Sequence, residues 1–112
     1  LVTSRFWAAE FEWFAHQELA LKAGIPEEAI EAIRTGRRPN FSDNKDEAVY
    51  VFCKALHEDH VVDDKTYQTV QELLGQEVLT DLIAMSGYYT LLAMILNVYE
   101  VPLPDGSRVF DE

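Results

Sequence analysis

Basic residues are scarce in this chain of 112 residues, and their scarcity argues against several classes of function. Lysine and arginine total nine against 20 aspartates and glutamates, which gives a formal net charge of -11. Binding to nucleic acid requires a basic surface facing the phosphates, and binding to an anionic bilayer requires the same kind of surface. We therefore predict neither a nucleic-acid partner nor a membrane partner. An excess of acidic residues usually serves solubility.

Cysteine, glycine and proline are also scarce. Cys53 is the one cysteine, so an intramolecular disulfide is excluded, and this indicates a cytoplasmic protein. Five glycines and four prolines are too few for the many turns of an all-β fold. No secretory signal pattern is visible, and because Leu1 begins inside a helix-like pattern we expect the native N-terminus to precede it. A single all-helical domain over residues 1–112 is predicted.

The spacing of apolar residues predicts about five helices in a compact bundle. The first is expected from about residue 2 to residue 23, because Lys22, Gly24 and Pro26 together mark a helix end. The others are expected over residues 26–35, 43–58, 63–74 and 76–100.

The last of these helices is unusually apolar. From Leu82 to Tyr99 no residue is charged, and this length reaches the lower limit for a membrane span. Polar residues within it and the acidity of the rest of the chain weigh against insertion. A helix that is apolar on all sides must nevertheless be covered on all sides. We therefore predict a homo-oligomer in which another subunit covers part of this helix.

Three polar residues fall on one side of the first predicted helix. At ~100° per residue, Arg5, Glu12 and His16 lie within about 40° of one another, in an apolar surround. A glutamate four residues before a histidine can accept its N–H, and such a histidine can transfer protons. Arginine can hold a carboxylate through two parallel hydrogen bonds. The alternative is a buried ion pair between Arg5 and Glu12, with His16 beside it.

Other candidate sites carry weaker signals. His57 and His60 could share a helix face as a metal pair, but no further ligand cluster with zinc spacing is present. Cys53 lies among apolar neighbours and is interpreted as a core residue. The sequence has no phosphate-binding glycine loop and no serine in a nucleophile elbow. We predict no metal and no cofactor.

The sequence resembles the carboxymuconolactone decarboxylase family, which includes the alkyl hydroperoxide reductase D-type peroxidases. The resemblance covers nearly the whole chain. It rests on residues 12–16 (EWFAH), 19–26 (LALKAGIP), 30–33 (IEAI), 61–67 (VVDDKTY), 87–90 (GYYT), 96–98 (LNV) and 102–104 (PLP).

The resemblance implies an all-α fold assembled as a trimer or hexamer, with His16 at the family's histidine position. The peroxidase branch uses a Cys-x-x-Cys pair just ahead of that histidine, where this chain has Ala9 and Glu12. Without those thiols the disulfide chemistry cannot run, so a peroxidase is disfavoured. The family's motif also has an upstream glutamate, which would fall before Leu1.

These inferences combine into one hypothesis, a cofactor-free carboxy-lyase or isomerase that acts on a small carboxylated lactone or oxo acid. His16 is the expected proton donor, Glu12 orients it, and Arg5 anchors the substrate carboxylate. Trp13 and Phe14 are expected to form apolar walls, partly from a neighbouring subunit. The alternative is a non-catalytic helical oligomer or a protein that binds a small ligand without transforming it.

Overall fold

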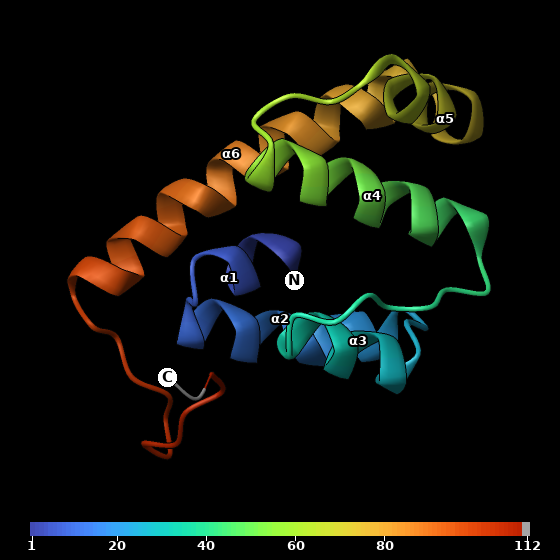
Figure 1. The fold of residues 1–112 in the computed structure, drawn as a ribbon. Coiled ribbons are helices and arrows are strands. Elements are labelled where there is room, and N and C mark those ends of the chain that lie inside the picture. The colour runs from blue at the N-terminus through green and yellow to red at the C-terminus, as the bar shows by residue number, and fades with distance from the viewer. Residues whose placement is uncertain (111–112) are drawn as a thin grey trace. The chain divides into compact units, whose positions relative to one another are not determined.

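The computed structural model describes residues 1–110, which form six α-helices and no strands (Figure 1). The all-α prediction is therefore confirmed. The helices are α1 (Val2–Phe6), α2 (Glu10–Lys22), α3 (Glu27–Arg34), α4 (Asn44–Glu58), α5 (Asp64–Leu74) and α6 (Gln76–Val98). The last four match the predicted ranges closely, because capping residues and glycines mark their ends.

The prediction of one continuous helix over residues 2–23 is wrong. The chain leaves the helix after Phe6, and Ala8 adopts a left-handed conformation with φ of 49°. The N–H of Ala9 then bonds to the carbonyl of Ser4 at 2.9 Å, and α2 starts at Glu10. A left-handed alanine is strained by roughly 1–2 kcal/mol. Since alanine is also the best helix former, the local sequence gives no sign of this break.

The contacts divide the chain into two compact units, and α6 contributes to both. Unit 2 spans Phe41–Tyr88 and contains α4, α5 and the first half of α6. Its core is made by Phe52 of α4, Val70 of α5 and Leu79 of α6, all almost completely buried. At the start of α5, Asp63 accepts a hydrogen bond from the N–H of Thr66 at 2.8 Å, as an N-cap does.

Unit 1 joins Leu1–Asn40 to the chain from Tyr89 onward. The indole of Trp13 on α2 is fully buried and meets the ring of Phe110 edge to face, with centroids 5.4 Å apart. Helix α3 buries Ile30 and Ile33, and the segment after α6 buries Leu103. The N-terminal helices and the end of the chain therefore share one apolar core.

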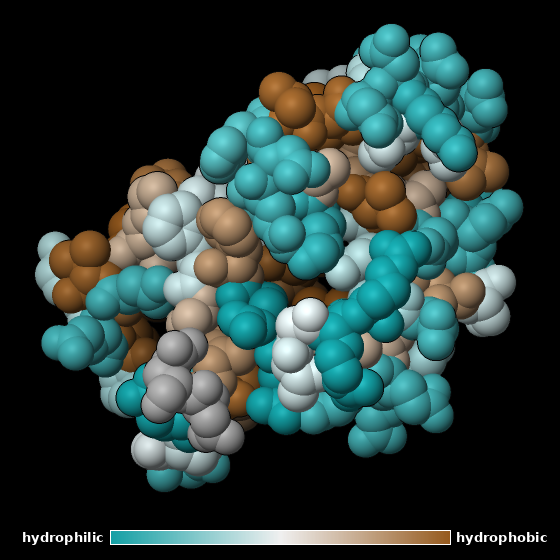
Figure 2. All heavy atoms as spheres, in the orientation of Figure 1, coloured by the Kyte–Doolittle hydropathy of each residue, from teal (hydrophilic) through white to brown (hydrophobic). Residues whose placement is uncertain are grey.

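Helix α6 exposes apolar side chains along much of its length. By length and composition alone it could span a membrane, and only 17% of its apolar window is buried. The buried positions Leu79, Ser86 and Ala93 recur every seven residues and mark the covered side. Figure 2 shows hydrophobic atoms at the surface where the C-terminal half of α6 lies. From residue 83 onward the large exposed apolar residues are Ile83, Met85, Tyr88, Leu91, Met94, Ile95 and Val98, with Tyr99 directly after the helix, and we call these eight the α6 apolar face.

Candidate functional site

The carboxyl group of Glu12 lies inside unit 1, where only 3% of the residue is exposed. Its Oε2 accepts a hydrogen bond from the hydroxyl of Ser4 at 3.2 Å, while its Oε1 has no partner within the described residues. Burial raises the pKa of Glu12 above its ordinary value, and the Ser4 hydrogen bond and nearby His16 oppose that rise. A buried carboxyl with one unpaired oxygen is typical of sites that bind or transfer protons.

The ring of His16 is held in a defined orientation. Its Nδ1–H donates to the main-chain oxygen of Glu12 at 2.8 Å, which assigns the proton of the neutral ring to Nδ1. The ring also meets Tyr89 edge to face, with centroids 4.9 Å apart and an interplanar angle of 83°. The side chain is half-buried, and its Nε2 makes no hydrogen bond within the described residues. Nε2 is therefore the atom of His16 available to a ligand.

The structure changes the expected role of Glu12. The sequence predicts that its carboxylate orients His16, whereas the hydrogen bond is made by its carbonyl group. In an α-helix a side chain points back toward the preceding turn, which brings the histidine ring to the carbonyl four residues earlier. The carboxyl group and His16 make no hydrogen bond to each other within the described residues, and the link between them is electrostatic, through the effect of His16 on the pKa of Glu12.

Arg5 does not join this pair. Its guanidinium carbon lies 5.4 Å from the centre of the Phe110 ring, a cation–π arrangement. Its Nη2 lies beside Gly36, and a Cβ added to that glycine would be 3.6 Å from Nη2. Its Nε is buried with no partner among the described residues. The expected grouping of Arg5 with Glu12 and His16 assumed one straight helix, and the turn at Ala8 removes that geometry.

The two aromatic residues predicted as walls behave differently from each other. Trp13 is completely buried, and its indole N–H donates to the side chain of Gln17 at 2.8 Å, so it belongs to the core. Phe14 is 44% exposed and packs against Phe11, with ring centroids 6.3 Å apart. Phe14 is therefore accessible to a ligand or a second subunit, whereas Trp13 is not.

Two residues at the site were missed by sequence reasoning. The contact of Tyr89 with His16 was not predicted, because Tyr89 lies 73 residues after His16 in the sequence. Glu10 accepts hydrogen bonds from the main-chain N–H groups of Val109 and Phe110, and no local pattern reveals such a partner. Both contacts depend on tertiary structure.

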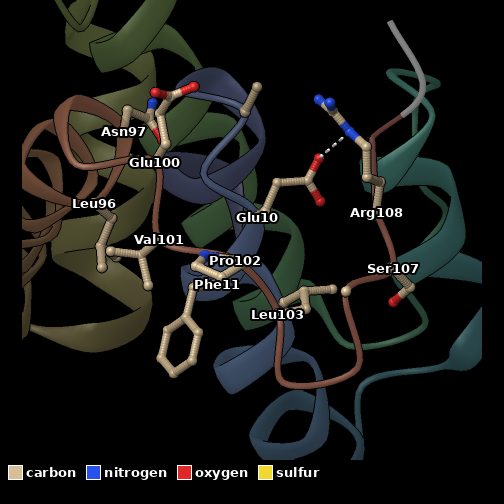
Figure 3. Close-up of a pocket in the computed structure, with 12 residues that line it drawn as sticks. Glu10, Phe11, Leu96, Asn97, Glu100, Val101, Pro102, Leu103, Ser107 and Arg108 are labelled. Carbon is tan, nitrogen blue, oxygen red and sulfur yellow. Dashed lines mark ion pairs between the residues drawn. The ribbon is translucent and has the colours of Figure 1, made fainter.

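Among the grooves on the surface of unit 1, two border α2. One of about 320 Å³ lies beside Glu10 and Arg108 (Figure 3). The other, of about 500 Å³, lies between α2 and α3. Neither is lined by Glu12 or His16. Within residues 1–110 no group of three or more metal-binding side chains is assembled.

Unit 2 holds the cysteine and a histidine on one helix face. The sulfur of Cys53 lies 4.0 Å from the hydroxyl of Ser86, and burial raises the pKa of the thiol. The Nδ1–H of His57 donates to the carbonyl of Cys53 at 2.7 Å. A buried thiol with a raised pKa is unreactive, which fits a packing role.

In comparisons with known proteins, no family model, no curated protein and no solved structure matches this chain. The resemblance to the carboxymuconolactone decarboxylase family therefore rests on the residues quoted above.

Proposed function

We propose that this protein is a cofactor-free cytoplasmic lyase or isomerase, related to the carboxymuconolactone decarboxylases, that acts on a small carboxylated lactone or oxo acid. The observation that carries the proposal is the state of His16. Its Nδ1 is held by the Glu12 carbonyl, its Nε2 makes no hydrogen bond within the described residues, and the half-buried residue interacts electrostatically with the buried carboxyl group of Glu12. This is the arrangement of a group that exchanges a proton with a ligand.

The proposed chemistry has two stages. Loss of carbon dioxide leaves an electron pair, which moves through a double bond onto the substrate carbonyl, and the enzyme stabilises that charge. The imidazolium of His16 then donates the proton on Nε2 to carbon. The ring is left neutral with its proton on Nδ1, which is the form that the Glu12 carbonyl holds.

A second copy of this chain completes the proposal. The α6 apolar face leaves eight large apolar side chains between 44% and 76% exposed, and a contiguous exposed apolar surface is typical of a protein interface. No lysine or arginine lies between Lys65 and Arg108, so α6 lacks the flanking cations that anchor helices in bilayers. A homo-oligomer, a trimer or hexamer by family resemblance, therefore accounts for this face better than a membrane does.

The direct test is turnover of a panel of carboxylated γ-lactones and 2-oxo acids, followed by carbon dioxide release. His16→Gln should lower kcat/KM by roughly 10²–10⁴-fold, the usual contribution of a general acid or base. His60→Gln is the matched control, because His60 is exposed in unit 2, and it should act at the wild-type rate. If His16→Gln turns over a substrate at the wild-type rate, His16 is not the proton donor.

The second candidate is a helical assembly protein that binds a ligand or a partner without chemistry. It is favoured by one observation, that the grooves beside Glu10 and between α2 and α3 are not lined by His16 or Glu12. If this second candidate is right, neither the wild type nor His16→Gln turns over any compound of the substrate panel. The two proteins then differ only in stability or assembly.

A further inference from the structure

The end of the described chain crosses unit 1 as a strap, which we define as residues 103–110. Its polar contacts with α2 within the described residues centre on the side chain of Glu10. The carboxylate of Glu10 accepts hydrogen bonds from the main-chain N–H groups of Val109 and Phe110, and it lies 3.6 Å from Nε of Arg108. Figure 3 shows Glu10 pointing toward Arg108 across the groove. A single carboxylate therefore holds three consecutive residues of the strap.

The tip of the strap is also held from α3 and from the core. The guanidinium of Arg34 donates to the carbonyl of Val109 at 2.9 Å. The side chain of Phe110 is 3% exposed and lies against both the indole of Trp13 and the guanidinium of Arg5. Phe110 is thus the strap residue whose ring lies against Arg5, the predicted substrate anchor.

In this arrangement Arg5 is not ready to bind a carboxylate. Two parallel hydrogen bonds from a guanidinium usually use Nε together with one of the terminal nitrogens. The Nε of Arg5 is inaccessible to solvent, and it has no hydrogen-bond partner among residues 1–110. A buried N–H without a partner is unfavourable by roughly 1–3 kcal/mol. An incoming carboxylate would relieve that penalty, but it needs a path to this atom.

We propose that the strap is a gate over Arg5, latched by Glu10, and that a small carboxylate reaches the Arg5 guanidinium when the strap is released. This inference rests on the role that the proposed function gives to Arg5. It adds the route of entry, and it assigns roles to Glu10 and Phe110 that sequence reasoning did not.

The composition of the latch suits reversible release. Arg108 is 68% exposed, so its pairing with Glu10 contributes little to stability. The main-chain hydrogen bonds to the Glu10 carboxylate are charge-assisted, and they can be weakened by removing the charge without removing bulk. The segment from Pro104 to Arg108 is exposed throughout, so its displacement uncovers little apolar surface. Most of the opposing free energy therefore comes from the buried side chains at the two ends of the strap, Leu103 and Phe110.

The first test measures strap opening without any ligand. Hydrogen exchange at the amides of Val109 and Phe110 should be about tenfold faster in Glu10→Gln than in the wild type. Glu18→Gln is the matched control, since Glu18 lies on the exposed side of the same helix. Equal exchange in all three proteins would overturn the latch.

The second test follows the Nε–H resonance of Arg5 by NMR, assigned through its loss in Arg5→Lys, while 4-oxopentanoate is added as the probe. We expect that resonance to shift on binding, with about tenfold tighter binding in Glu10→Gln, because the open fraction sets the apparent affinity. Phe110→Leu, which keeps an apolar side chain, should also bind more tightly. Arg5→Lys in the Glu10→Gln background should lose most of the binding.

An unchanged affinity in both strap variants would overturn the gate. Because this readout requires no turnover, a protein that binds the probe through Arg5 but releases no carbon dioxide would refute the proposed function and leave the gate standing.

Discussion

His16 and Glu12 are joined through the main chain: Nδ1 of His16 lies 2.8 Å from the carbonyl oxygen of Glu12, one helical turn earlier. The acidic side chain of Glu12 turns instead to the hydroxyl of Ser4, 3.2 Å away. The main-chain carbonyl and the side-chain carboxyl group of Glu12 therefore have separate roles. The carbonyl fixes the proton position on the imidazole, and the buried carboxyl sets the local charge.

The charge of Glu12 should make stability depend on pH. Because burial raises its pKa above 4.5, the folded state binds more protons than the unfolded state does, and stability falls as pH rises through the raised pKa. Glu12→Gln removes that loss and keeps an acceptor for Ser4. We expect it to stabilise the protein by about 1–3 kcal/mol at pH 8 and much less at pH 4.

Thermal unfolding at the two pH values measures this difference. Glu18→Gln, which removes an exposed carboxylate from the same helix, serves as the control. A gain in Glu12→Gln that is the same at pH 4 and pH 8 contradicts the assignment of the penalty to charge.

The turn between α1 and α2 should tolerate glycine. Ala8 has φ of 49°, a conformation that glycine adopts freely. Ala8→Gly should therefore be neutral or stabilising by up to about 1 kcal/mol, since relief of strain exceeds the added entropy of the unfolded chain. The matched control is Ala15→Gly, in the exposed middle of α2, which should destabilise by roughly 0.5–1 kcal/mol. Urea unfolding of both variants decides the point, and equal losses would mean that residue 8 is helical in solution.

Cys53 should be slow to react. Its thiol is largely buried and its pKa is raised, so little thiolate is available near neutral pH. We expect iodoacetamide at pH 8 to modify the folded protein about 100-fold more slowly than the protein in urea. Mass spectrometry over time measures both rates, and similar rates would show that the thiol is accessible in the native state.

The α6 apolar face should control assembly. Ile95→Glu places a charge in its middle and should convert the oligomer to a monomer in light scattering at micromolar concentration. Gln68→Glu adds the same charge on the exposed side of α5 and should leave the assembly intact. A wild-type protein that is monomeric, or that partitions into neutral phosphatidylcholine vesicles, would refute this use of α6.

The ring of Phe52 should contribute strongly to the stability of the unit 2 core. Phe52 is 2% exposed and packs among Val70 and Leu79. Phe52→Ala should destabilise by about 3–5 kcal/mol, and Phe52→Leu by less, because it leaves a smaller cavity. Urea unfolding compares the two, and equal losses would show that the ring does not fill this core.

Some features of this protein were determined by local sequence. Lys22 and Gly24 end α2, and Asp63 begins α5, because the groups that stop or cap a helix lie within a few residues of its end. The apolar run of α6 likewise predicted a long helix. His16 stood out for its neighbours on the same turn, and Glu12 is indeed its hydrogen-bond partner, through the carbonyl.

The tertiary structure alone decided the rest. The break at Ala8 places a favoured helix former in a strained conformation, which only its surroundings can hold. Phe110 lies against Arg5, and Glu10 receives main-chain N–H groups from about a hundred residues later in the chain. Helical periodicity relates residues one or two turns apart, so it carries no information about such distant contacts. The turn at Ala8 and the contact of Arg5 with Phe110 are therefore properties of the tertiary structure.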